Sequence, residues 1–109
     1  MSYEVKSIPK FERELKRLAK KYPSLKLEFI ELVQTLKEKP NQGTPLGNAC
    51  YKLRLAIASK GKGKSGGARA ITYVHVSLTT VYMLTIFDKS ERENISDKEL
   101  TTLLMQIPS

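Results

Sequence analysis

The spacing of the hydrophobic residues changes along this chain, and the change restricts the class of fold that the chain can adopt. In the first 40 residues, apolar side chains recur every three or four positions, as on one face of a helix: Phe11, Leu15, Leu18, Tyr22, then Leu25, Phe29, Leu32 and Leu36. From residue 51 they recur every second position, as on a strand with one buried face: Tyr51, Leu53, Leu55 and Ile57. Helices and strands are therefore segregated, which indicates an α+β fold with helices packed on a sheet.

Prolines and one capping motif set the bounds of the expected helices. Pro9 suits the first turn of a helix, Pro23 separates two helices of a hairpin, and Pro40 follows the second helix. Ser96 and Glu99 form a capping box, which predicts a C-terminal helix from about residue 97 to 106. Residues 41–48 are rich in Gly, Pro and Asn and are predicted to form a loop.

The remaining segments are predicted strands. We expect them at about residues 2–7, 51–58, 68–76 and 80–87, with the last two joined as an antiparallel hairpin. The predicted order is β-α-α-β-β-β-α. This order corresponds to a mainly antiparallel four-stranded sheet, covered by an N-terminal helical hairpin and a C-terminal helix. A chain of 109 residues suits one such domain, spanning residues 1–109.

Positive charge is concentrated in the middle of the chain. The formal net charge is +8, and the segment between residues 40 and 87 contains no Asp or Glu. Its basic residues are Lys52, Arg54, Lys60, Lys62, Lys64 and Arg69. Such a run is often only a solvated surface, but here no carboxylate lies nearby in sequence to neutralise it. The segment therefore favours a polyanionic partner and salt-sensitive phosphate contacts.

Several other kinds of site are disfavoured. With Cys50 as the only cysteine and His75 as the only histidine, no internal disulfide, paired-cysteine metal site or Ser-His-Asp set can be built. The run Gly63-Lys64-Ser65 is like a nucleotide-binding loop, but that motif needs a glycine where Ala58 stands and a helix after the loop. We therefore expect no metal and no cofactor.

Membrane insertion and export are also not expected. No apolar run approaches the roughly 20 residues needed to cross a bilayer. The first residues have no apolar signal-peptide region behind a charged start. We expect a soluble cytoplasmic protein.

Two motifs in the basic segment resemble a known family. Cys50-Tyr51-Lys52-Leu53-Arg54-Leu55 resembles the strand that carries the catalytic cations in RelE, and residues 60–69, K-G-K-G-K-S-G-G-A-R, resemble the loop signature of HigB-like toxins. The resemblance to the RelE/HigB superfamily of bacterial type II toxins extends in order over nearly the whole chain. It implies ribosome-dependent cleavage of mRNA, in which the ribose 2′-OH attacks the adjacent phosphate, and inhibition by a cognate antitoxin.

The resemblance also implies roles for individual cations. Lys52 is the expected group for phosphate stabilisation or proton transfer, and Arg69 for stabilising the transition state. Arg54 stands where RelE has a second lysine, so it can bind charge but is a poor base. The catalytic set implied is Lys52, Arg54, Arg69 and Lys89, and the RNA-binding set is Lys60, Lys62, Lys64 and Arg92.

Two departures from RelE leave other functions open. Ser90 and Ser96 stand where RelE has an arginine and a tyrosine that can stack on a base, so the RelE mechanism does not transfer intact. One alternative is a ParE-type toxin of the same fold that inhibits DNA gyrase without cutting RNA. The other is a decayed, non-catalytic protein that binds RNA or antitoxin.

Overall fold

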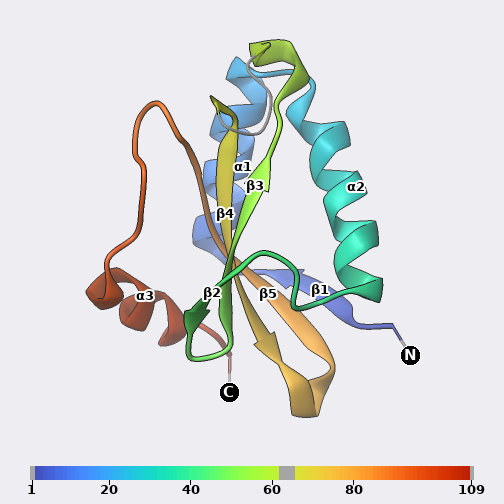
Figure 1. The fold of residues 1–109 in the computed structure, drawn as a ribbon, viewed down its shortest axis with the longest axis vertical. Helices are drawn as coiled ribbons and strands as arrows, with labels where there is room; N and C mark the ends of the chain where they lie inside the picture. Colours follow the sequence, from blue (N-terminus) through green and yellow to red (C-terminus); the bar gives the residue numbers. More distant parts are fainter. Residues whose placement is uncertain (1, 62–65, 109) are drawn as a thin grey trace.

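In the computed structural model, which describes residues 2–61 and 66–108, a twisted five-stranded sheet organises the chain (Figure 1). The strand order is β1-β5-β4-β3-β2; β1 is parallel to β5 and the other neighbours are antiparallel. The strands are β1 (Glu4–Ser7), β2 (Thr44–Gly47), β3 (Cys50–Leu55), β4 (Ala68–His75) and β5 (Thr80–Asp88). The α+β class is confirmed, whereas the predicted number of four strands is wrong.

The additional strand is β2, which lies inside the predicted loop 41–48. It pairs with β3 at the edge of the sheet, where Pro45 lies opposite Tyr51. An edge strand tolerates proline, because the missing N–H is not needed by a second neighbour. The following two-residue turn, Asn48 and Ala49, has positive φ at both positions (53° and 60°), as in the type I′ turns that join hairpin strands.

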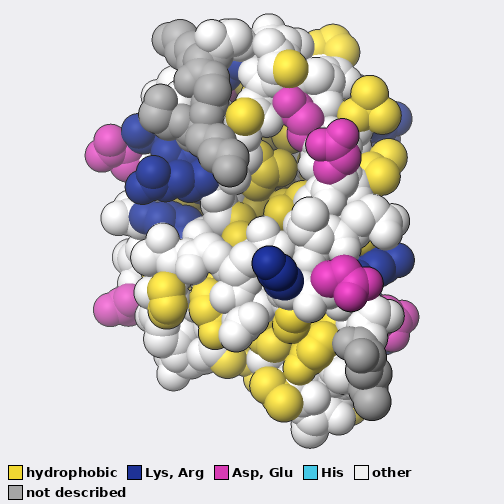
Figure 2. Space-filling view, turned by 45° about the vertical axis from the view of Figure 1, so that its right-hand side comes forward, with side chains coloured by type: hydrophobic (Ala, Val, Ile, Leu, Met, Phe, Trp, Pro, Cys, Tyr) yellow, Lys and Arg dark blue, Asp and Glu magenta, His cyan; other side chains and the backbone are white. Residues whose placement is uncertain are grey.

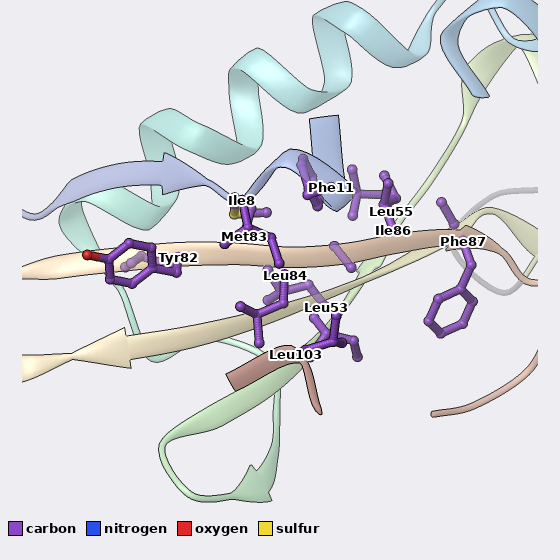
Figure 3. Packing of buried hydrophobic residues seen from close by; sticks show 14 of the residues in the cluster. Ile8, Phe11, Leu53, Leu55, Tyr82, Met83, Leu84, Ile86, Phe87 and Leu103 are labelled. Carbon is purple, nitrogen blue, oxygen red and sulfur yellow. The ribbon is translucent and has the colours of Figure 1, made fainter. Parts of the chain in front are cut away.

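The helices cover both faces of the sheet. The predicted hairpin consists of α1 (Pro9–Lys21) and α2 (Leu25–Glu38), and the C-terminal helix is α3 (Asp97–Leu104), two residues shorter than predicted. Figure 3 shows Ile8 and Phe11, at the start of the helical hairpin, on one side of β5 and Leu103 of α3 on the other. All nine residues of β5 are buried, as expected for a strand between two neighbours and two layers of helix.

The N-cap hydrogen bond of the predicted capping box at the start of α3 is present, whereas Glu99 Oε1 accepts from the Ser96 hydroxyl at 3.4 Å and not from its backbone N–H. The Glu99 backbone N–H donates to Ser96 Oγ at 3.1 Å. Ser96→Ala should therefore lower the free energy of unfolding by about 1 kcal/mol, which denaturant titration can measure. Thr101→Ala is the matched control, because it removes an exposed hydroxyl within the same helix without touching the cap. A loss that is no larger for Ser96→Ala than for Thr101→Ala would contradict the capping role.

Candidate functional site

The register of β3 and β4 gathers three of the predicted site residues on one face of the sheet. Arg54 lies directly opposite Arg69. Lys52 lies opposite Ile71, and this pair is two residues away from the Arg54–Arg69 pair on each strand. Residues that oppose each other in a sheet, and those two apart on a strand, project from the same face. Lys52, Arg54 and Arg69 therefore form one group, which we call the cation cluster.

Arg69 is the buried member of the cation cluster. Arg69 is only 4% exposed, whereas Arg54 is exposed. Nη1 of Arg69 donates to the Ala68 carbonyl oxygen at 3.1 Å. Burial and the neighbouring Arg54 charge lower the pKa of Arg69, while Glu93 acts in the opposite direction. Because a guanidinium stays protonated well above neutral pH, Arg69 supplies a cation of fixed position.

The segment between β5 and α3 adds polar groups to the same face. Lys52 Nζ donates to Asn94 Oδ1 at 3.3 Å. The Arg92 guanidinium lies 5.3 Å from the centre of the Phe87 ring, and Phe87 is opposite Arg69 in the sheet. Arg92, predicted to bind RNA, thus lies beside the cation cluster. Figure 2 shows Lys and Arg side chains gathered together at the upper left.

Sequence reasoning missed Asn94 and Glu93 as neighbours of the cation cluster. Both lie in an irregular segment, and they reach the cluster only because the chain folds back from β5 over the sheet before α3 begins. No periodic pattern marks such residues, so no sequence signal identified them.

Lys60 has a different environment from the one predicted. It ends a short 3-10 helix, Ala58–Lys60, and its ammonium forms an ion pair with Asp88. The Lys60 side chain is 10% exposed and that of Asp88 is 0% exposed. Asp88 lies in register with Ala68, and hence on the face opposite Arg69. These contacts argue against the RNA-binding role predicted for Lys60, because its charge is already neutralised and largely buried.

Asp88 is held by several donors at once. Tyr22 Oη donates to Asp88 Oδ2 at 2.7 Å, and the Ser90 backbone N–H and hydroxyl donate to Oδ1 at 2.9 and 2.8 Å. Burial alone would raise the pKa of Asp88, but the hydrogen bonds from Lys60, Tyr22 and Ser90 outweigh it and hold that pKa well below the ordinary value of 3.8. Asp88 therefore ties the end of α1, the 3-10 helix and the turn after β5 together.

Of the other predicted cations, Lys89, Lys62 and Lys64, the structure describes only Lys89. Lys89 is half-buried, and its backbone N–H donates to the Gly67 carbonyl oxygen at 3.0 Å; within the described chain its side chain makes no hydrogen bond or ion pair. Lys62 and Lys64 lie outside the described residues. Of the eight predicted site residues, the structure thus brings together Lys52, Arg54, Arg69 and Arg92.

The residues set aside on sequence grounds lie away from the cation cluster or are inert. Burial raises the pKa of the Cys50 thiol to about 11, so this thiol is protonated at neutral pH. His75 ends β4, with Nδ1 3.2 Å from Ser77 Oγ.

Among residues 2–61 and 66–108, no three His, Cys, Asp or Glu side chains gather as metal ligands would. No helix in the described ranges is both long and apolar enough to cross a membrane.

This arrangement is suited to binding a phosphate group. Two guanidinium groups and one ammonium lie on one face, and at least Arg69 is partly shielded from water. Charge-assisted hydrogen bonds from guanidinium groups are strong and match the geometry of phosphate oxygens.

Comparisons with known proteins agree on one family. A family model described as the RelE toxin of the RelE/RelB toxin–antitoxin system matches residues 10–106. The chain is similar to a solved structure of Escherichia coli RelE, a double arginine-to-alanine mutant in the free state, with a TM-score of 0.66 and 14% identity over 99% of this chain and 100% of that one. It is also similar to a chain of the RelBE2 toxin–antitoxin complex from Mycobacterium tuberculosis, with a TM-score of 0.57 and 20% identity over 81% of this chain and 92% of that one. At these identities the structural similarity shows the fold.

Proposed function

Since the chain belongs to the RelE toxin family and is thus a toxin of a toxin–antitoxin system, we propose that it is a ribosome-dependent endoribonuclease that cuts translated mRNA. The observation that carries the proposal is the cation cluster, in which Arg54 lies opposite Arg69 and Lys52 shares their face. RNA cleavage by an internal nucleophile needs stabilisation of the negative charge on the phosphorane oxygens and a proton donor for the leaving 5′-oxygen, and in this proposal the cation cluster supplies both.

In the proposed reaction the ribose 2′-oxygen attacks the adjacent phosphorus. The 2′-OH gives up its proton to a water molecule as a bond forms between O2′ and phosphorus. The bond from phosphorus to O5′ breaks, and the products carry a 2′,3′-cyclic phosphate and a 5′-hydroxyl. Arg54 and Arg69 stabilise the negative charge that develops on the phosphorane oxygens. Lys52 donates a proton to the leaving 5′-oxygen, because an arginine holds its protons too tightly for that step.

The remaining cations act on the RNA around the scissile phosphate. Arg92, beside Phe87 at the edge of the cation cluster, binds the RNA backbone. Lys89 adds a further cation at the same end of the sheet, and Lys62 and Lys64 bind messenger or ribosomal RNA. Contacts of this kind depend steeply on salt concentration. The proposed partners are the ribosome, its mRNA and a cognate antitoxin in the cytoplasm. Complex formation with an antitoxin is supported by the similarity to a chain of a toxin–antitoxin complex.

Expression of the chain in a bacterial host tests the proposal. Induction should arrest growth, and translated mRNA should acquire cuts within codons, with downstream fragments that begin with a 5′-hydroxyl. Purified protein should cut mRNA on translating ribosomes, and the same RNA without ribosomes should stay intact. Sequencing of the 5′ ends measures both results.

Two outcomes would contradict the nuclease. One is intact mRNA in cells that contain the soluble, folded protein. The other is inhibition of gyrase in a supercoiling assay without RNA cleavage, which would assign the chain to the ParE-type alternative.

A further inference from the structure

A groove lies beside the cation cluster at the open edge of β3. The pairing of β2 with β3 extends from Cys50 only to Lys52, so the end of β3 faces α2 without a covering strand. The groove has a volume of about 340 Å³, and it is lined by Glu28, Glu31, Leu32, Thr35, Gln42, Arg54, Leu55 and Ala56. Figure 2 shows a hollow with hydrophobic atoms between the gathered Lys and Arg side chains and a group of acidic ones. Arg54 belongs to both the groove and the cation cluster.

One carboxylate at the groove is already used by the fold. Glu28 Oε2 accepts from the Ala58 backbone N–H at 2.7 Å, and its Oε1 accepts from the Ser24 hydroxyl at 3.0 Å. Glu28 therefore holds α2 to the short 3-10 helix Ala58–Lys60 that follows β3, and it has little capacity left for a ligand.

Apart from the Arg54 guanidinium, the polar groups that remain available at the groove are acceptors. Thr35 Oγ1 donates to the Leu32 carbonyl oxygen, and Gln42 Nε2 donates to Thr35 Oγ1 and to the Lys39 carbonyl oxygen, at 3.0 and 3.2 Å. This leaves the Gln42 amide oxygen free to accept. Glu31 is exposed, and within the described residues its carboxylate makes no hydrogen bond or ion pair. A ligand that fits must therefore bring hydrogen-bond donors to the part of the groove formed by Glu31 and Gln42.

We propose that this groove binds a guanine base of the RNA; the inference deepens the proposed function and rests on it. Guanine presents two adjacent donors, N1–H and the N2 amino group, which match the two oxygens of the Glu31 carboxylate. Adenine, cytosine and uracil place at most one donor beside an acceptor on that edge. Single-stranded RNA is recognised in this way, with splayed bases bonded on their Watson–Crick edges. Leu32 and Leu55 contact the faces of the base.

Charge sets the orientation of the nucleotide. The Glu31 carboxylate repels a phosphate, whereas Arg54 at the other wall attracts one. A guanosine whose base lies in the groove therefore has its phosphate at Arg54, next to Arg69. The groove then selects guanosine beside the phosphate held by the cation cluster.

Nucleotide titration by NMR tests the groove without requiring cleavage. The probes are guanosine, adenosine, cytidine and uridine 3′-monophosphates, added to the protein with labelled leucine methyl groups. Guanosine 3′-monophosphate should shift the methyl resonances of Leu32 and Leu55 and bind roughly tenfold more tightly than the other three. Glu31→Gln should abolish this preference. Glu38→Gln, which removes the same charge two turns along α2 and outside the groove, should retain it.

The outcomes separate the groove from the nuclease. Equal binding of the four nucleotides, unshifted Leu32 and Leu55 methyl groups, or a preference that survives Glu31→Gln would each overturn the guanine site. So would shifts of the same methyl groups by an arginine amide and not by guanosine 3′-monophosphate, which would indicate a basic protein segment instead. A protein that binds guanosine in the groove but cuts no RNA would overturn the nuclease alone.

Discussion

Arg69→Ala should slow RNA cleavage on translating ribosomes by about 10²–10³-fold and abolish growth arrest. Arg69 is buried opposite Arg54, so its guanidinium is held in place and partly shielded from water, where its interaction with a phosphorane oxygen is strongest. Lys52→Ala should have an effect of similar size, because it removes the group proposed to protonate the leaving 5′-oxygen. Single-turnover cleavage rates measure both effects.

Controls for these two variants address charge and folding. Lys26→Ala removes one positive charge from an exposed position on α2, and it should leave cleavage unchanged. The thermal midpoint of Arg69→Ala separates loss of the cation from loss of the fold, since Arg69 is buried. Arg69→Lys restores a positive charge without the guanidinium fork, so it should recover only part of the rate. If the Lys52 and Arg69 alanine variants both remained fully toxic, the active site would be wrongly placed.

Asp88→Asn should lower the free energy of unfolding by about 3–5 kcal/mol, a large part of the stability of a domain of this size. The variant keeps a side chain of the same shape but leaves the largely buried Lys60 ammonium without its counter-ion. Lys60→Met combined with Asp88→Asn removes the buried Lys60 charge that lacks a counter-ion, so the double variant should be more stable than Asp88→Asn alone. Denaturant titration measures all three proteins. An Asp88→Asn variant as stable as the wild type would show that the ion pair does not stabilise the fold.

The same carboxyl predicts a pH dependence of stability. The hydrogen bonds of Asp88 depress its pKa in the folded state, so its ionised form contributes stability above the unfolded value near 3.8. That contribution is lost as the pH falls through the lower, folded-state value. The difference in unfolding free energy between wild type and Asp88→Asn should therefore be constant near neutral pH and shrink below about pH 4. A difference that grows on acidification would contradict this assignment.

The elements that were predicted correctly are those with a local signal. The apolar faces of α1 and α2, the N-cap at Ser96 and the two-sided burial of β5 each follow from side chains within one element. The strand β2 was missed because its Pro and Gly residues are typical of loops, and only its position at the sheet edge makes them acceptable in a strand.

Sequence alone determined the types of most elements, the α+β class and the concentration of cations between residues 52 and 69. Tertiary structure decided which of these cations act together. Strand register places Arg54 opposite Arg69 on one face, and Asp88, 28 residues beyond Lys60, neutralises that lysine on the other. The physical reason is that periodicity reports on one element at a time. Burial and charge pairing, by contrast, depend on distances through space between segments that are far apart in the chain.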